Sequence, residues 1–191
     1  MIRLAFCALG LWLMAPAPAG PSDAANNESQ SVAAAGPAAT DKSIETINAA
    51  RALTAEALSS APLGFRRILF VREVPEGFAA YEPRDNNVFT ADEPLIVYTE
   101  PIGVDWTMGG DEFSANLSVD FEIRSPDGKV LAGQRGFGEF ALSAREPPLD
   151  FMTHVKLDVT GAAAGHYILG LTMHDTKSGK STTVDMPFEV K

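Results

Sequence analysis

The sequence predicts a mainly β protein: an antiparallel sandwich of about eight strands, preceded by one short α-helix and a disordered, exported N-terminal linker. Three observations support this class. Beyond residue 66 the apolar residues recur with the two-residue period of a strand instead of the period of a helix. Short apolar runs then alternate with turn signals rich in Gly, Pro and Asp. No helical run interrupts them, which favours antiparallel sheets.

The start of the chain has the layout of a secretory signal peptide. Arg3 provides the positive charge, residues 4–14 form an apolar run, and predicted cleavage points follow Ala17 and Ala19. The run is shorter than the ~20 residues that a membrane-spanning helix requires, and an uncleaved N-terminal anchor is the alternative. We expect removal of the signal peptide, residues 1–19, and a secreted or periplasmic protein.

The single cysteine, Cys7, lies inside the predicted signal peptide. Its place within the apolar run, and the bulky Phe6 before it, argue against a lipid attachment site. Once the signal is removed no thiol remains, which excludes disulfides, thiolate nucleophiles and cysteine-ligated metals. The domain must then be held together by packing, and no cofactor is predicted.

The formal net charge is −10 at pH 7. Nucleic acids and anionic membrane surfaces bind clusters of Lys and Arg, so this charge disfavours both as partners. We expect an unknown protein or glycan partner, no nucleic acid, and no stable membrane insertion after signal cleavage. The acidic charge by itself identifies no partner, because it also keeps exported proteins soluble.

The segment between the signal peptide and the sandwich divides into a linker and a helix. Residues 20–40 carry Val32 as their one apolar side chain larger than Ala, and they predict a disordered linker. Residues 41–62 predict an amphipathic helix that ends near Pro62. Its apolar face is shallow, so we expect it to pack against something larger, with docking onto a partner as the alternative. The face consists of Ile44, Ile47, Ala50, Thr54, Ala57 and Leu58.

Residues 63–191 are predicted to form the β-sandwich domain. The clearest strand is FSANLSVDFEIR, residues 113–124, in which apolar and polar residues alternate without interruption. Alternate side chains of a strand point to opposite faces, so one face should be buried and the other should meet water. The next four residues, Ser-Pro-Asp-Gly at 125–128, suit a type I turn and predict a hairpin.

Near its end the sequence reads DVTGAAAGHYILGLTMHDTKSGK, residues 158–180. This stretch resembles the closing hairpin of bacterial immunoglobulin-like modules, in which Gly-x-Tyr opens the penultimate strand and a Gly-containing turn closes it. The resemblance implies an immunoglobulin-like sandwich. It also implies that Tyr167 acts as a corner tyrosine, with its hydroxyl bonded to the backbone.

Two of the three histidines, His166 and His174, lie in this predicted penultimate strand. They share its outer face, and eight residues at ~3.3 Å each separate them by roughly 26 Å. Ligands of one zinc ion lie within a few ångströms of each other, so these two cannot share a metal. His154 belongs to another predicted strand, which we expect in the opposite sheet. The sequence therefore predicts no metal site.

Acidic residues crowd the segment 85–112, namely Asp85, Asp92, Glu93, Glu100, Asp105, Asp111 and Glu112. A glycosidase needs two carboxyl groups facing each other across a cleft, and calcium needs several converging oxygens. The segment lacks the regular spacing of a calcium-binding loop. Solvated loop and strand-edge acids are the favoured interpretation, and a calcium loop or a catalytic pair are the alternatives.

Trp106 is the one tryptophan that remains after signal removal, and it follows directly on Asp105. An exposed Trp beside acids is suited to build a platform for a sugar or a peptide. In a sandwich a lone Trp more often fills the core. Trp106, Asp105 and Glu100 are the candidate ligand-binding residues.

The sequence thus predicts an exported, non-catalytic β-sandwich module with a protein-interaction or envelope-structural role. Neither G-x-S-x-G nor a Gly-rich phosphate loop occurs, so no catalytic residue is predicted and the protein is not expected to be an enzyme. The first alternative is a small-ligand or carbohydrate-binding module around Trp106, with or without calcium. The weakest alternative is a carboxylate-dependent hydrolase.

Overall fold

The structure, a computed structural model, describes residues 37–191, with side chains from residue 41 onward. The predicted signal peptide, 1–19, and residues 20–36 of the predicted linker lie outside the described residues. The predicted mainly β class is confirmed, because one helix precedes nine strands in the described part of the chain. The elements are α1 (Pro37–Ser60), β1 (Gly64–Phe70), β2 (Val88–Phe89), β3 (Leu95–Ile102), β4 (Thr107–Gly109), β5 (Glu112–Arg124), β6 (Val130–Ala144), β7 (Thr153–Leu157), β8 (Gly165–Asp175) and β9 (Ser181–Val190).

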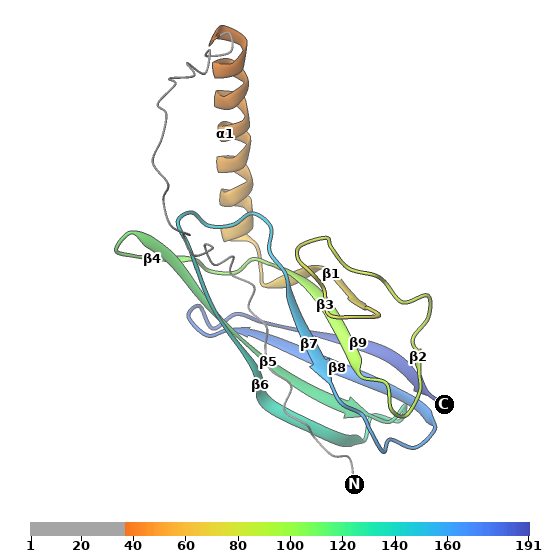
Figure 1. Cartoon of the computed structure of the whole chain (residues 1–191). Coiled ribbons are helices and arrows are strands. Elements are labelled where there is room, and N and C mark those ends of the chain that lie inside the picture. Colours follow the sequence, from red (N-terminus) through yellow and green to blue (C-terminus); the bar gives the residue numbers. More distant parts are fainter. Residues whose placement is uncertain (1–36) are drawn as a thin grey trace, which may run out of the picture.

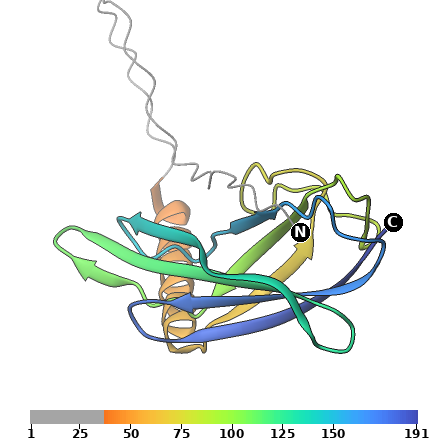
Figure 2. The ribbon, with the colours of Figure 1, turned by 90° about the horizontal axis from the view of Figure 1, so that it is seen from below.

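The strands form two sheets that lie one above the other as layers (Figure 2). The smaller sheet has the order β1-β3-β7, and the larger has the order β2-β9-β8-β5-β4, with β6 also paired to β5. Neighbouring strands are antiparallel except β2 and β9, which are parallel. The two-layered arrangement agrees with a sandwich, and the immunoglobulin-like label stays a prediction.

The alternation in β5 places its side chains as predicted. Leu117, Val119, Phe121 and Ile123 are buried in the core between the sheets. Glu122, which lies between two of them, is exposed on the outer face. Burial of every second residue on one face is the pattern that a half-buried strand requires. The predicted turn after β5 is also present.

The hydroxyl-to-backbone hydrogen bond predicted for Tyr167 is present, and the residue is half-buried. Its hydroxyl donates a hydrogen bond of 2.7 Å to the carbonyl oxygen of Ala163, four residues upstream. Its ring stacks on Phe188 of β9, with 5.4 Å between the ring centroids. The contact ties the link before β8 to the core of the larger sheet.

Helix α1 begins earlier and ends earlier than the predicted range 41–62. Its first residue is Pro37, so residues 37–40, expected in the linker, are helical. Proline is favoured in the first helical turn because its missing N–H has no intrahelical acceptor there, and the alanines that follow are strong helix formers. At the other end the hydroxyls of Ser59 and Ser60 donate to the carbonyls of Glu56 and Ala57. The helix ends at Ser60, before Pro62.

The helix projects away from the sandwich instead of lying along it (Figure 1). Ile44, Ile47 and Leu53 are 49%, 57% and 68% exposed. Only the last turns, with Ala55 and Leu58, line a cavity together with described residues of the sandwich. The expectation that the apolar face packs against something larger is therefore met only at the base of the helix. Within residues 37–191, no helix has the length and apolar character needed to span a membrane.

Strand β3 is buried on both faces, because the long segment between β1 and β3 crosses the outer face of the smaller sheet. Val71, Ile96 and Tyr98 form a second small core there. The ring of Tyr81, from the crossing segment, packs against Tyr98 with 4.2 Å between the centroids. The backbone N–H of Ala79 donates to the Tyr98 hydroxyl at 2.9 Å.

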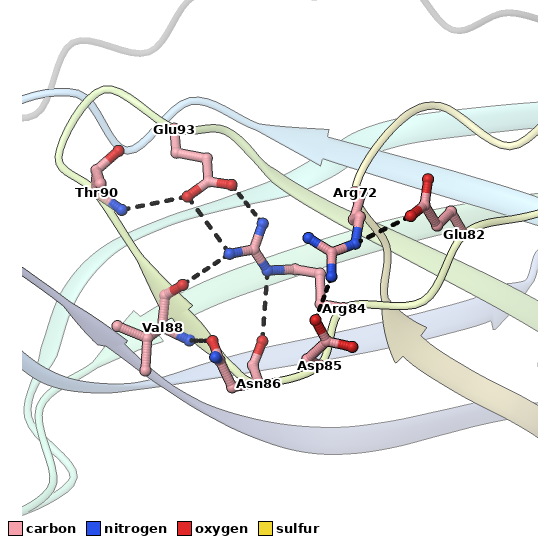
Figure 3. A network of polar contacts seen from close by, with 8 residues as sticks. All are labelled: Arg72, Glu82, Arg84, Asp85, Asn86, Val88, Thr90 and Glu93. Atoms are coloured by element: carbon pink, nitrogen blue, oxygen red, sulfur yellow. Dashed lines mark hydrogen bonds and ion pairs between the residues drawn. The ribbon is translucent and has the colours of Figure 1, made fainter.

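Ion pairs hold the crossing segment in place (Figure 3). The guanidinium of Arg84 pairs with the Glu93 carboxylate and donates to the Val88 carbonyl at 2.7 Å. Arg72 pairs with Asp85 and, at 3.2 Å, with Glu82. The burial of Glu93 acts to raise its pKa, but hydrogen bonds from Arg84 and from the Thr90 N–H, with the charges of Arg84 and Arg72, outweigh this and lower the pKa. The segment between β1 and β3 is thus held in a defined position over the outer face of the smaller sheet.

Candidate functional site

Trp106 lies in the short link between β3 and β4, at the side of the sandwich where the base of α1 approaches it. Its ring is half-buried and packs edge to face against Phe151, with 5.9 Å between the centroids and an interplanar angle of 87°. It lines two separate cavities. Trp106 is therefore neither a buried core residue nor an isolated platform, and serves as the wall between two hollows.

The larger hollow is an apolar groove of about 830 Å³. It lies where a long strand of the larger sheet meets a short strand of the smaller sheet, because β6 has 15 residues and β7 has 5. The apolar inner face of β6 therefore continues beyond the strand that should cover it. The groove, called the Trp106 groove below, has Phe78, Trp106, Phe140, Leu142, Phe151 and Met152 among its lining residues.

The smaller hollow has a volume of about 240 Å³ and lies between the base of α1 and the sandwich. Ala55 and Leu58 of the helix form one wall. Trp106, Leu149 and Phe151 are among the residues that line the remainder. Asp105 also lines it, so the structure brings two of the three predicted ligand-binding residues, Asp105 and Trp106, to the same hollow.

The turn between β8 and β9 positions the link that carries Trp106. The Asp105 N–H donates to the carboxylate of Asp175 at 2.8 Å. The Lys180 ammonium donates to the carbonyl of Gly103 at 3.0 Å and to that of Ala61 at 3.2 Å. Because these contacts join the β8–β9 turn, the Trp106 link and the end of α1, the turn fixes the geometry of both hollows.

Gly103 is required where this link passes the end of the helix. Its φ is +74°, and a Cβ at this position would lie 2.1 Å from the carbonyl oxygen of Pro62. Gly103→Ala should lower the free energy of unfolding by about 2 kcal/mol or more, measured by urea denaturation. Gly110→Ala is the matched control, because Gly110 has a φ of +66° with no described atom within 4 Å of the added Cβ. Equal losses in the two variants would show that the contact with Pro62 is unimportant.

Glu100, the third predicted ligand-binding residue, lines neither hollow. It is buried on the outer face of the smaller sheet, 2% exposed, and pairs with Arg66 at 2.6 Å and with Arg67 at 3.7 Å. The Tyr98 hydroxyl donates to it at 2.8 Å. Burial raises the pKa of Tyr98 to about 12; the Ala79 N–H lowers it and Glu100 raises it further.

Glu100 contacts the groove only indirectly, because it pairs with Arg66 and Arg66 contacts Phe78. The same guanidinium that pairs with Glu100 lies 5.2 Å from the centroid of the Phe78 ring. A cation over an aromatic face attracts the ring electrostatically, so Arg66 holds Phe78 at the rim of the Trp106 groove. Glu100 is thus a structural acid in this arrangement.

The acids of residues 85–112 do not gather around one hollow. Asp85 and Glu93 pair with arginines of the crossing segment, and Glu100 pairs with arginines of β1. Asp105 lines the smaller hollow. The favoured interpretation of solvated acids is therefore wrong for Glu100, because two half-exposed arginines compensate for its burial.

The three histidines lie apart. His166 and His174 are at opposite ends of the outer face of β8, and His174 pairs with Asp120 at 3.0 Å. His154 is in β7, in the other sheet, and lines the Trp106 groove. Burial and, second, the charge of Lys156 lower the pKa of His154. In the described part of the chain, no three His, Cys, Asp or Glu side chains lie together in a group that could hold a metal ion.

The sequence-based reading missed most of the groove. Phe140 and Leu142 lie within the predicted sandwich domain, and nothing in the sequence around them indicates that the inner face of β6 lacks a cover. Phe151 follows Pro147 and Pro148 in the loop before β7. This loop carries several apolar residues where a solvated loop would carry polar ones, and that composition was the available signal.

Comparison with known proteins does not place the chain in a family. No family model and no curated protein matches it. Among solved structures it is similar to a family 123 glycoside hydrolase from Clostridium perfringens, described in terms of glycolipid glycan hydrolysis. The identity is 11% and the TM-score is 0.38, over 69% of this chain and 27% of that one. The chain thus spans about a quarter of that enzyme's length.

Proposed function

We propose that this protein is an exported, non-catalytic β-sandwich module that binds another protein, secreted or periplasmic in location, and that the Trp106 groove receives an apolar segment of the partner. The observation that carries the proposal is the groove itself. Its volume of about 830 Å³ lies open along the side of the sandwich, and aromatic and aliphatic side chains from β6 and from the loops beside it line it.

The chemistry of the lining favours a protein segment over a sugar. The groove has four polar lining residues, Glu76, Ser143, Thr153 and His154, but apolar surface makes up most of its lining. A polyhydroxylated ligand needs a larger convergent set of hydrogen-bonding groups. Burial of apolar surface is the main favourable term in protein association. Aromatic residues in a partly desolvated hollow are also the residues in which binding energy concentrates.

A small-ligand role is the second candidate, and the smaller hollow favours it. This hollow of about 240 Å³ is lined mainly by apolar side chains and includes the acid Asp105. Such a site suits a small apolar molecule with one polar group, since its volume is below the ~300 Å³ of ordinary ligand pockets.

The proposal of a non-catalytic module is supported by the arginine pairs of Asp85, Glu93 and Glu100, which occupy these carboxylates.

Site-specific photo-crosslinking tests the protein-binding proposal. A benzophenone amino acid placed at Phe78, 37% exposed at the groove rim, should crosslink to a partner protein in the native envelope. The matched control position is Leu131, which is 44% exposed on β6 and does not line the groove. Mass spectrometry of the crosslinked products reads out the result. Equal crosslinking at both positions, or none at Phe78, would contradict protein binding in the groove.

A further inference from the structure

The free side of β7 is the feature from which a binding mode can be inferred. Within residues 37–191, strand β7 is the last strand of the smaller sheet and pairs only with β3. Val71 donates its N–H to the Ile96 carbonyl at 2.9 Å, so the backbone groups of Ile96 point towards β1 and away from β7. Backbone groups in a strand alternate in direction. Lys156, which is opposite Ile96, and His154, two residues earlier, therefore turn their N–H and C=O groups away from β3.

This open backbone edge borders the Trp106 groove. Thr153 and His154, the first two residues of β7, and Met152 directly before them line the groove on one side. Phe140 and Leu142, from the inner face of β6, line it on the other side. Among the described strands, β6 is itself paired only with β5. An extended segment beside β7 would thus cover the part of the apolar face of β6 that the short smaller sheet leaves open.

We propose that the groove is the place of a missing strand, and that an extended segment of a partner protein adds antiparallel to the free edge of β7. The inference rests on the proposed function and specifies the form of the partner. The segment hydrogen-bonds to the backbone of His154 and Lys156. Its alternate apolar side chains cover Phe140 and Leu142. This is the β-augmentation mode of recognition, in which the backbone supplies affinity and alternate side chains supply specificity.

The charges beside the edge define the other face of the segment. His154 and Lys156 point their side chains to the outer face of the smaller sheet, since the buried Thr153, Val155 and Leu157 alternate with them. Oppositely charged residues that face each other across two strands attract. The segment therefore carries an acid opposite Lys156. A span of about five residues matches β7, whose length is ~17 Å at 3.3 Å per residue.

A synthetic peptide of this pattern tests the inference. The probe is the acetylated and amidated heptapeptide Ser-Val-Glu-Val-Glu-Val-Ser. It is titrated into the full chain carrying Trp12→Phe, so that Trp106 is the one tryptophan. Saturable binding with a change in Trp106 emission is expected, together with slower hydrogen exchange at the His154 and Lys156 amides. Binding without that slower exchange, or no binding, would overturn strand addition.

Two matched peptides separate strand addition from simple apolar contact. In an antiparallel pair, residues that exchange hydrogen bonds share one face, so the glutamate N–H groups of the probe point to β7. N-methylation of both glutamates should weaken binding about tenfold or more, because it removes these hydrogen bonds. N-methylation of two valines should have a much smaller effect. Equal effects, or a loss only with the methylated valines, would contradict antiparallel addition.

Reversal of the charges on Lys156 and on the peptide tests the predicted pairing between Lys156 and an acid of the segment. Lys156→Glu should lower the affinity for the probe severalfold. The same variant should bind more tightly a peptide in which lysines replace both glutamates. No change in either affinity would overturn the predicted acid opposite Lys156. A dimer of the chain that excludes the probe would identify a second copy as the occupant and overturn a partner segment. If a partner crosslinks at Phe78 but N-methylation of the glutamates does not weaken peptide binding, the proposed function stands and the addition of a strand to β7 is refuted.

Discussion

Phe121→Ala should lower the free energy of unfolding by about 3–5 kcal/mol, the range for loss of a large aromatic side chain from a packed core. Phe121 is 1% exposed on the inner face of β5. Its ring packs against Phe137 with 4.9 Å between the centroids. Alanine would leave a cavity that neighbouring side chains in two sheets fill only partly. Urea denaturation followed by circular dichroism measures the loss.

Glu122→Ala is the matched control for this prediction. Glu122 is the next residue along β5, on the outer face, and its carboxylate is 3.8 Å from the guanidinium of Arg124. Removal of such an exposed side chain should change the free energy of unfolding by less than about 0.5 kcal/mol. Similar losses in the two variants would mean that the two faces of β5 are wrongly assigned.

Asp175→Ala should lower the free energy of unfolding by about 2–4 kcal/mol, because three backbone donors lose their acceptor. The fully buried carboxylate of Asp175 accepts hydrogen bonds from the N–H groups of Asp105, Lys177 and Ser178, at 2.8, 3.0 and 3.2 Å. The first of these holds the link to Trp106, so the emission of Trp106 should also change. Thermal melting and fluorescence measure the two effects. An unchanged melting temperature would refute this role.

The same carboxylate predicts an acid dependence of stability. Burial acts to raise the pKa of Asp175, but the hydrogen bonds from Asp105, Ser178 and Lys177 outweigh it and bring the pKa below the ordinary value of 3.8. A depressed pKa in the folded state means that the ionised carboxylate stabilises the fold above pH 3.8, and that this contribution is lost as the pH falls through the lower, folded-state pKa.

Asp175→Asn provides the comparison, because asparagine keeps the shape and cannot ionise. The wild-type protein should be more stable than this variant at neutral pH, and the difference should shrink as the pH falls from 3.8 through the folded-state pKa of Asp175. Unfolding at a series of pH values from neutral to acid measures it. A difference that is constant over this range would show that ionisation of Asp175 does not contribute.

Local patterns in the sequence were sufficient for much of the fold. The side of β5 that faces the core, from Leu117 to Ile123, could be predicted because successive side chains of a strand point to opposite faces whatever the strand packs against. The place of His166 and His174 on the outer face of β8 follows from the same period. The helix could be located from its 3.6-residue pattern, although its start at Pro37 was missed because Pro and Ala occur in linkers and in first helical turns alike.

The candidate site was only partly accessible to such reasoning. Trp106 and Asp105 were predicted as ligand-binding residues, and the structure places both at one hollow. Glu100 was grouped with them because it is close in sequence. It lies instead on the outer face of the smaller sheet, since it belongs to β3, where it shares that face with Tyr98 and pairs with Arg66. No local pattern reports which arginine a strand acid meets.

The amino-acid sequence by itself determined the mainly β class, the inward face of the strands and the hairpin turns, because these depend on dihedral preferences and on a two-residue period along one segment. Only the tertiary structure decided that β7 is too short to cover β6, that the base of α1 closes a hollow behind Trp106, and that Asp175 holds the link between them. Those features depend on the relative lengths of strands in different sheets and on contacts between distant segments, which no stretch of sequence contains.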